Sequence, residues 1–305
     1  MTAGLSFSEA VPRTATLAPV ANDGSPLSPA VLDEHHFRLL VDWLERGTGV
    51  CIHAHRQPGL RRMLAERLRE LDQDGETYCA RVVRYGTASA EHQWLLDRLL
   101  IHETAFFRHQ ESHDFVRRQV QEYRRSGVDS GLNLWSLGCA TGEEAYSLAL
   151  DALAGGARRF AVIGTDISRA VLSHARQGVY PLAAMAVAGH GLPADWIEPA
   201  GSGYFRFAAQ VREHVAFVAD NALAQRTGIF PEGVDIIFCQ NLLIYQRRWR
   251  RHALLDFLAS RLKPGGYLII GPGEGADWQS AALQKVRSRL VCAYWRPRNP
   301  GVPRA

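Results

Sequence analysis

Apolar residues near the start of the chain recur at the spacing of amphipathic helices. One stripe precedes a break at Gly47 and Gly49, a second follows it, and a third helical segment is expected over residues 92–108. We therefore predict a small helical domain, 28–100, and a linking segment, 101–130, in which the next domain begins. The stripes consist of Phe37, Leu40, Val41 and Leu44; Leu60, Leu64, Leu68 and Leu71; and Trp94, Leu95, Leu99 and Leu100.

The pattern changes at Leu132, where short apolar runs begin to alternate with helical stretches. Such alternation is typical of βαβ units, whose parallel sheet is covered by helices on both faces. We predict an α/β domain over residues 131–296. Its expected strands are 132–137, 160–164, 234–239 and 267–270, and its expected helices are 142–153, 169–177 and 249–262.

Two segments depart from this alternation. Residues 181–218 are rich in glycine and then alternate in polarity from residue 211, which predicts an inserted antiparallel β-subdomain. The last strand candidate, 290–295, precedes a proline-containing tail, 297–305, that we expect to be loose. Residues 1–27 lack periodicity and are expected to form a flexible leader.

The composition is that of an ordinary globular protein: of 305 residues, 47% are hydrophobic and 22% are charged. No run approaches the roughly 18 apolar residues of a membrane helix, so we expect a cytoplasmic protein without membrane insertion. The five cysteines form no C-x-x-C pair, and histidine pairs such as His109 and His113 lack cysteine or acidic partners at ligand spacing. We therefore predict neither disulfide nor metal site. A net charge of +4 is too small to indicate nucleic-acid binding.

The strongest local motif is 135–144, where a predicted strand passes through a glycine turn into a helix. Gly138 and Gly142 would let a ligand approach the backbone, and a helix start offers unpaired N–H groups. The motif lacks the third glycine of a dinucleotide site, and Glu143 and Glu144 would repel a pyrophosphate, so an NAD enzyme is disfavoured. A nucleotide-type ligand with positive charge fits better. Alternatively, the two acids only interact with the helix dipole.

Three further segments carry candidate chemistry. Asp166 ends the next predicted strand, where it would bind a ribose or cap the following helix. Asn241 follows a later strand, and ligands of open α/β sheets bind beyond the carboxyl ends of their strands. The segment 104–108 by itself indicates core packing by two phenylalanines and a solvated arginine.

Six motifs follow one another along the chain: TAFFR (104–108), GCATGEEAYSLAL (138–150), TDIS (165–168), ARQGVY (175–180), FCQNLLIY (238–245) and LKPGG (262–266). Together they resemble the CheR-type chemotaxis receptor methyltransferases over about residues 30–296. This resemblance implies a Rossmann-like class I S-adenosylmethionine methyltransferase sheet of seven strands. It also implies an inserted antiparallel β-subdomain and an all-helical N-terminal domain.

The activity implied by the resemblance is protein-glutamate O-methylation. A methyl group would pass from S-adenosylmethionine to glutamate side chains of a chemoreceptor cytoplasmic domain, giving methyl esters and S-adenosylhomocysteine. Because a glutamate with a pKa of about 4.3 is already ionised at neutral pH, its attack needs no general base. The enzyme chiefly needs to align the two groups.

Site residues are carried over from the family motif by motif. Glu143, or its neighbour Glu144, would hold the methionine ammonium, and Asp166 would hold the ribose. Asp220 and Asn221 would lie near the adenine, and Asn241 beside the methionine moiety. Arg108 and Tyr245 would face the substrate carboxylate as the catalytic pair. The full cofactor-binding set implied by the resemblance is His102, Thr104, Arg108, Gly138, Glu143, Asp166, Asp220, Asn221 and Asn241.

Two surfaces could recognise the partner. The family grips acidic receptor helices with a basic helix, which here would present Arg61, Arg62, Arg67 and Arg69; the alternative is an ordinary solvated face with i, i+4 ion pairs. Some relatives capture a receptor peptide by strand addition to the β-subdomain, whereas others do not. The aromatic residues of 204–207 could line such a groove or cover the main sheet.

Some positions depart from the family pattern. His102 replaces an asparagine and Gln240 an arginine, while Glu274 stays in register. We expect cofactor binding to persist and rate or substrate preference to change. Two alternatives therefore stay open: a signalling adaptor that binds S-adenosylmethionine or S-adenosylhomocysteine with little turnover, and a methyltransferase that acts on another signalling protein.

Overall fold

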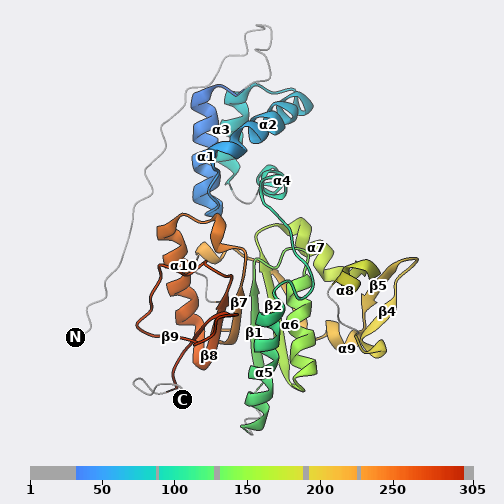
Figure 1. The fold of residues 1–305 in the computed structure, drawn as a ribbon. Helices are drawn as coiled ribbons and strands as arrows, with labels where there is room; N and C mark the ends of the chain where they lie inside the picture. Colours follow the sequence, from blue (N-terminus) through green and yellow to red (C-terminus); the bar gives the residue numbers. More distant parts are fainter. Residues whose placement is uncertain (1–31, 87–88, 127–130, 188–191, 225–227, 299–305) are drawn as a thin grey trace, which may run out of the picture.

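The computed structural model describes residues 32–86, 89–126, 131–187, 192–224 and 228–298 (Figure 1). The predicted leader and residues 299–305 of the predicted tail lie outside the described residues. A group of helices forms one end of the molecule, and a mixed sheet flanked by helices forms the other.

In the described part of the N-terminal region the chain forms four α-helices: α1 (Glu34–Thr48), α2 (Gln57–Leu71), α3 (Gly75–Tyr85) and α4 (Ala90–Leu99). Short side chains begin three of them, since Asp33, Asp74 and Ser89 each accept a backbone N–H of the first turn. The predicted stripes meet in one buried cluster that includes Phe37, Leu64 and Tyr78.

The predicted helix over 92–108 was wrong beyond Leu99, because Leu100 has extended backbone with ψ near 150° and ends α4. The sequence pattern also failed to indicate two helices, α3 and α5 (Gln110–Arg125). Helix α5 begins the α/β part and packs along α6 (Glu143–Ala154).

Within the described residues, seven strands form the main sheet in the order β6-β2-β1-β7-β8-β10-β9. Neighbours from β6 to β8 pair in parallel, whereas β10 runs antiparallel to both β8 and β9. The strands are β1 (Leu132–Leu137), β2 (Phe160–Asp166), β6 (Val215–Ala219), β7 (Val234–Cys239), β8 (Leu262–Ile270), β9 (Gln284–Lys285) and β10 (Cys292–Trp295).

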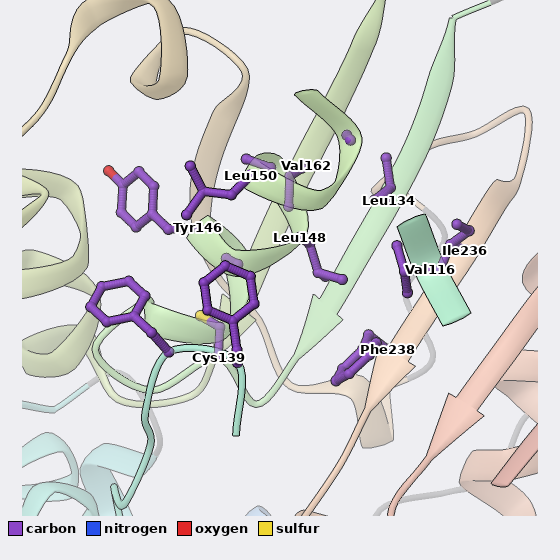
Figure 2. Packing of buried hydrophobic residues seen from close by; sticks show 14 of the residues in the cluster. Val116, Leu134, Cys139, Tyr146, Leu148, Leu150, Val162, Ile236 and Phe238 are labelled. Atoms are coloured by element: carbon purple, nitrogen blue, oxygen red, sulfur yellow. The ribbon is translucent and has the colours of Figure 1, made fainter. Parts of the chain in front are cut away.

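The sheet is buried on both faces, as the apolar runs predicted. Side chains such as Leu134 and Phe238 pack on one face against α5 and α6 (Figure 2). Alternate residues of the same strands, such as Trp135 and Ile237, pack on the other face against α10 (Arg248–Arg261). Helix α7 (Arg169–Gln177) follows β2 and contacts β6. The carboxyl ends of β1, β2 and β7 are thereby left as the place for a ligand.

The inserted antiparallel sheet exists, with β5 (Tyr204–Phe207) between β3 (Val179–Pro181) and β4 (Ile197–Pro199). Short helices α8 (Leu182–Val187) and α9 (Ala209–Arg212) lie beside it.

The prediction that residues 211–218 form part of this antiparallel sheet was wrong. Val211 lies in α9, and β6 pairs in parallel with β2 at the edge of the main sheet. An edge strand with one buried face shows the same alternation in either sheet. In β6 the buried side chain is that of Phe217. Its ring packs so closely on β2 that a Cβ added to Gly164 would lie 2.8 Å from it.

Candidate functional site

A pocket opens at the carboxyl ends of β1, β2 and β7, on the side that faces the helical region. Most of the residues that the sequence nominated line it. They are His102, Thr104, Arg108, Gly138, Asp166, Asp220, Asn221, Asn241 and Tyr245.

The glycine turn after β1 forms one part of the floor. Gly138 has φ of 76°, and Ala140 has φ of 45°, a conformation that is costly for a residue with a Cβ. Gly142, with φ of 99°, stands where a Cβ would lie 2.8 Å from Ala175 and 2.9 Å from the Tyr180 hydroxyl. The turn therefore needs glycine both for its backbone conformation and for its close packing.

Asp166 lies beside this turn at the end of β2. One carboxylate oxygen accepts the N–H of Ala140 at 3.0 Å and the other accepts the N–H of Ser168 at 2.9 Å. Burial raises the pKa of Asp166, while these N–H groups act in the opposite direction. The capping alternative does not hold, because Ser168 is the residue that caps α7. The carboxylate retains lone pairs for a further donor from the pocket.

The two adjacent glutamates at the start of α6 have different surroundings. Glu144 lines the pocket and accepts a hydrogen bond from the Ser136 hydroxyl at 2.6 Å. Glu143, our first choice for the ammonium ligand, is not among the residues that line the pocket; its carboxylate accepts a 2.6 Å bond from Thr141. Burial raises the pKa of Glu144 to about 8, with a smaller contribution from the charge of Glu274. Glu144 is thus the acid placed to meet a cation.

Asn241 is held rigidly at the end of β7. Its backbone has φ of 57°, and its N–H donates to Glu274 at 3.1 Å. Its side-chain oxygen lies 3.0 Å from Nε2 of His109. The buried Glu274 also accepts the N–H groups of Ile244 and Gly271, so one carboxylate fixes the loop that presents Asn241.

The segment 102–108 lines another part of the pocket, through His102, Thr104 and Arg108 among others. Phe107 has φ of 51° and donates its N–H to Ser147 on α6, which holds the segment against the sheet domain. Arg108 is exposed at the pocket and donates to the carbonyl of Glu103 at 2.8 Å. His102 lines the pocket with a buried Nε2 that has no hydrogen-bond partner among the described residues. That nitrogen remains available to a ligand.

Sequence reasoning missed that the helical region closes the pocket. Thr48 lines it from the end of α1, and Val50 and Arg56 line it from the connection between α1 and α2. The sequence signal that could have indicated this contact was the break at Gly47 and Gly49. Gly49, with φ of 76°, lies so close to the α/β domain that a Cβ would come within 2.2 Å of Leu223 and 2.5 Å of Gln246.

Backbone pairing joins this connection to the loop of Tyr245. Val50 and Gln246 form an antiparallel bridge, and the N–H of Cys51 donates to the Tyr245 carbonyl at 2.7 Å. The side chain of Asn221, nominated for the adenine, donates to the Gly47 carbonyl at 2.7 Å. The polypeptide around Tyr245 is therefore positioned by both parts of the molecule.

An ion pair also joins the helical region to the α/β domain. The carboxylate of Glu45 accepts the N–H of Ile52 at 2.7 Å and lies 2.6 Å from the Arg247 guanidinium. Although burial alone would raise its pKa, Arg247 and the Ile52 N–H hold the pKa of Glu45 below its usual value.

The arginines nominated for partner binding on α2 divide into two pairs. Arg61 pairs with Glu34 and lies over the Phe37 ring, and Arg67 binds Glu91 and Glu70. Hydrogen bonds to these acids raise the pKa of Arg67. Both residues are thus engaged within the helical region. Arg62 and Arg69 are exposed.

Gln240, one of the departures from the family pattern, has a structural role. It is buried, and its amide donates to the Ser112 hydroxyl at 2.9 Å and to the Ile270 carbonyl at 3.3 Å. It therefore joins the end of β7 to α5 and β8.

The described residues contain no group of three or more His, Cys, Asp or Glu side chains arranged to hold a metal ion. None of their helices is both long and apolar enough to span a membrane.

The donors and acceptors of the pocket suit a ligand with both cationic and polar parts. Glu144 would meet a positive charge, and Asp166 could accept hydroxyl groups of a sugar. The loop after β6, with Asp220 and Asn221, adds a further polar edge. These residues fit S-adenosylmethionine, which carries an ammonium, a sulfonium and a ribose.

Comparison with known proteins agrees with this geometry. Residues 102–292 match the family described as CheR methyltransferase, SAM binding domain. The chemotaxis protein methyltransferase of Salmonella typhimurium is 30% identical over 255 residues, 80% of this chain and 84% of that protein. The Escherichia coli chemotaxis protein methyltransferase is 29% identical over 249 residues, with coverage of 80% and 85%.

A relative with a different name is the probable biofilm formation methyltransferase WspC of Pseudomonas putida. It is 34% identical over 234 residues, 73% of this chain, and the match spans 53% of that protein's length. Among solved structures, the N-methyltransferase NodS of Bradyrhizobium japonicum with S-adenosyl-L-homocysteine has 15% identity and a TM-score of 0.38, covering 70% of this chain and 96% of that one.

The predicted fold class is confirmed by these observations: a sheet mainly of parallel strands, a separate small antiparallel sheet and an N-terminal helical region. The predicted cofactor is confirmed by the family, whose matched part is its S-adenosylmethionine-binding domain. The chain therefore belongs to the CheR family of S-adenosylmethionine-dependent methyltransferases.

Proposed function

We propose that the protein methylates glutamate side chains on the cytoplasmic domain of a chemoreceptor and releases S-adenosylhomocysteine. The observation that carries this proposal is the position of Arg108 and Tyr245. Both line the same pocket as the acidic groups Glu144 and Asp166, at the carboxyl edge of the sheet. A cationic and a phenolic group beside an acidic floor suit a carboxylate acceptor next to a cationic cofactor. The site of action would be the cytoplasm.

Cofactor binding would be shared between the floor and its rim. Glu144 would hold the ammonium, Asp166 the ribose hydroxyls, and the loop of Asp220 and Asn221 the adenine. The backbone turn at Gly138 would let the ligand approach closely. When bound, S-adenosylmethionine supplies an activated methyl group on a sulfonium.

Alignment would be the main contribution of the protein. The acceptor carboxylate is ionised at neutral pH, so no residue must remove a proton. Arg108 would orient this carboxylate through paired N–H donors, and Tyr245 would donate through its hydroxyl. Positioning the reacting groups in this way can contribute roughly 7–11 kcal/mol of the barrier reduction.

The test is methyl transfer from tritiated S-adenosylmethionine to a panel of chemoreceptor cytoplasmic fragments. A methyl ester is base-labile, whereas an N-methyl product is not, so release of the label by mild alkali identifies the glutamyl ester. Turnover would exclude a non-catalytic adaptor. Base-stable label, or label only on other proteins in a cell extract, would contradict the proposal.

Removing the positioning groups gives a second readout. Arg108→Ala is expected to lower kcat/KM by about a hundredfold or more, because a charged hydrogen-bond donor to the acceptor contributes about 3 kcal/mol. Tyr245→Phe removes only the hydroxyl and should cost less. S-adenosylhomocysteine binding by Tyr245→Phe, measured by calorimetry, is the control for an intact pocket.

A further inference from the structure

A patch of arginine and tryptophan lies next to the pocket, at the start of α10. We call residues 247–251, the run Arg-Arg-Trp-Arg-Arg, the arginine–tryptophan patch. Trp249 is 64% exposed, and the side chains of Arg247 and Arg248 are 55% and 70% exposed. Trp249 is among the most exposed of the large hydrophobic side chains in the described part of the chain, and it is surrounded in sequence by four arginines.

The patch continues directly from the catalytic loop. Tyr245 and Gln246 line the pocket and immediately precede Arg247. Ile244, on the other side of Tyr245, is 51% exposed. A protein segment that delivers a side chain to Tyr245 would therefore meet the patch within a few residues of the acceptor.

The fold accounts for only part of this positive charge. Arg247 pairs with Glu45, Arg250 donates to the carbonyls of Glu45 and Arg46, and Arg248 pairs with Asp277. Of the four guanidinium groups of the patch, two thus form ion pairs, with the carboxylates of Glu45 and Asp277, which leaves an excess of positive charge.

Its position within α10 is also unfavourable for local stability. The first turn of the helix contains no acidic residue, although the positive end of a helix dipole favours anions. Trp249 contacts the Arg250 guanidinium, 4.9 Å from its ring, and is otherwise turned to solvent. An anionic partner would relieve the excess charge and cover the indole.

We propose that the arginine–tryptophan patch docks an acidic segment of the acceptor protein, continuous in sequence with the glutamate that enters the pocket. This inference rests on the proposed glutamate methylation and adds a surface to it. The patch differs from the α2 candidate in two respects: it directly follows the loop of Tyr245, and it carries an exposed tryptophan, Trp249. Tryptophan and arginine are the side chains that most often dominate the energy of protein interfaces.

The experiment compares steady-state methylation of a receptor fragment by the wild type and by the double variant Arg248→Glu with Trp249→Ala. We expect KM for the fragment to rise about tenfold or more, the effect of losing one interface anchor. The dissociation constant of S-adenosylhomocysteine and the unfolding midpoint should stay unchanged. Arg248→Glu loses an exposed pair with Asp277 and faces that carboxylate, a screened surface cost that an anion in the first turn of α10 offsets.

Salt supplies an independent readout. Raising NaCl from about 0.05 M to about 0.5 M should increase KM of the wild type, because exposed charges are screened, and should change KM of the double variant much less. Arg125→Glu is the matched control, since it reverses an exposed arginine at the far end of α5. It should leave KM at the wild-type value.

Failure of each hypothesis has its own signature. The docking inference alone is contradicted if the wild type methylates the fragment and the double variant has a KM within about twofold of the wild-type value. The same holds if Arg62→Glu with Arg69→Glu raises KM and the double variant does not, or if the patch binds phosphatidylglycerol vesicles without affecting KM. A wild type that transfers no methyl group to any receptor fragment would contradict the proposed function itself.

Discussion

The floor and the wall of the pocket are built in different ways. The floor comes from the sheet, where Asp166 and Glu274 accept backbone N–H groups within one buried domain. The wall comes from residues 47–56 of the helical region, which are joined to the α/β domain by the Val50–Gln246 bridge, by backbone and side-chain hydrogen bonds such as that of Asn221 with Gly47, and by an ion pair whose Arg247 side chain is 55% exposed. The ligand-binding groups of the floor are thus fixed within one domain, whereas closure of the pocket depends on contacts between two parts of the molecule.

The largest effect should come from the floor. Asp166→Ala removes an acceptor for the ribose and also leaves the N–H groups of Ala140 and Ser168 without their partner. We expect S-adenosylhomocysteine to bind about a hundredfold more weakly, since losing a charged hydrogen-bond partner costs about 2–3 kcal/mol. Isothermal calorimetry measures this directly. Binding within threefold of the wild type would mean that the floor does not set affinity.

A smaller effect should come from the wall. Gly49→Ala combines a positive φ with a collision against Leu223 and Gln246, and we expect a loss of about 2 kcal/mol in the free energy of unfolding. The matched control is Gly203→Ala, where φ is 79° and a Cβ would meet nothing within 4 Å, so that only the backbone cost of about 1 kcal/mol remains. Urea unfolding of both variants separates collision from backbone strain. Equal losses of unfolding free energy in the two variants would contradict close packing between Gly49 and the α/β domain.

The smallest effect concerns pH. Because burial raises the pKa of Glu144 to about 8, the carboxyl is protonated in the free protein at pH 7. Its contribution to stability is therefore full below its unfolded pKa and is lost as pH rises through 8. A bound ammonium favours the ionised form, so binding of S-adenosylhomocysteine should tighten roughly fifteenfold from pH 6.5 to 8 and release close to one proton at pH 7.

Calorimetry in buffers of different ionisation enthalpy counts this proton. Glu144→Gln should abolish both its release and the pH trend, whereas Glu143→Gln should retain them, because Glu143 interacts with Thr141 and does not line the pocket. If Glu143→Gln instead removed the trend, the first assignment from sequence would be restored.

The floor was largely predictable, because its parts are local in sequence. A strand, a glycine turn and a helix define Gly138, and an acid at the end of the next strand defines Asp166. The choice between Glu143 and Glu144 was not predictable in the same way. Consecutive residues differ by about 100° around a helix, so the outcome depends on the orientation of α6, which is fixed by packing against α5 and the sheet.

The wall could not be predicted for a different reason. Its contacts join residues nearly two hundred positions apart, such as Gly47 with Asn221 and Val50 with Gln246. The glycine break at residues 47 and 49 marks a change of chain direction, but it does not identify the segments of the α/β domain that pack there. The assignment of residues 211–218 to the wrong sheet has a similar origin, because alternation reports one buried face and does not identify the neighbouring strand.

The bridge between Val50 and Gln246 also defines the smallest piece of the chain that can form a complete pocket. The part that matches the family's cofactor-binding domain begins at residue 102, yet Thr48, Val50 and Arg56 belong to the enclosure. A fragment cut at the family boundary would open one side of the cavity to water and release the backbone around Tyr245. In this protein the functional unit is larger than the recognisable catalytic module, and its N-terminal helices are part of the active site's architecture.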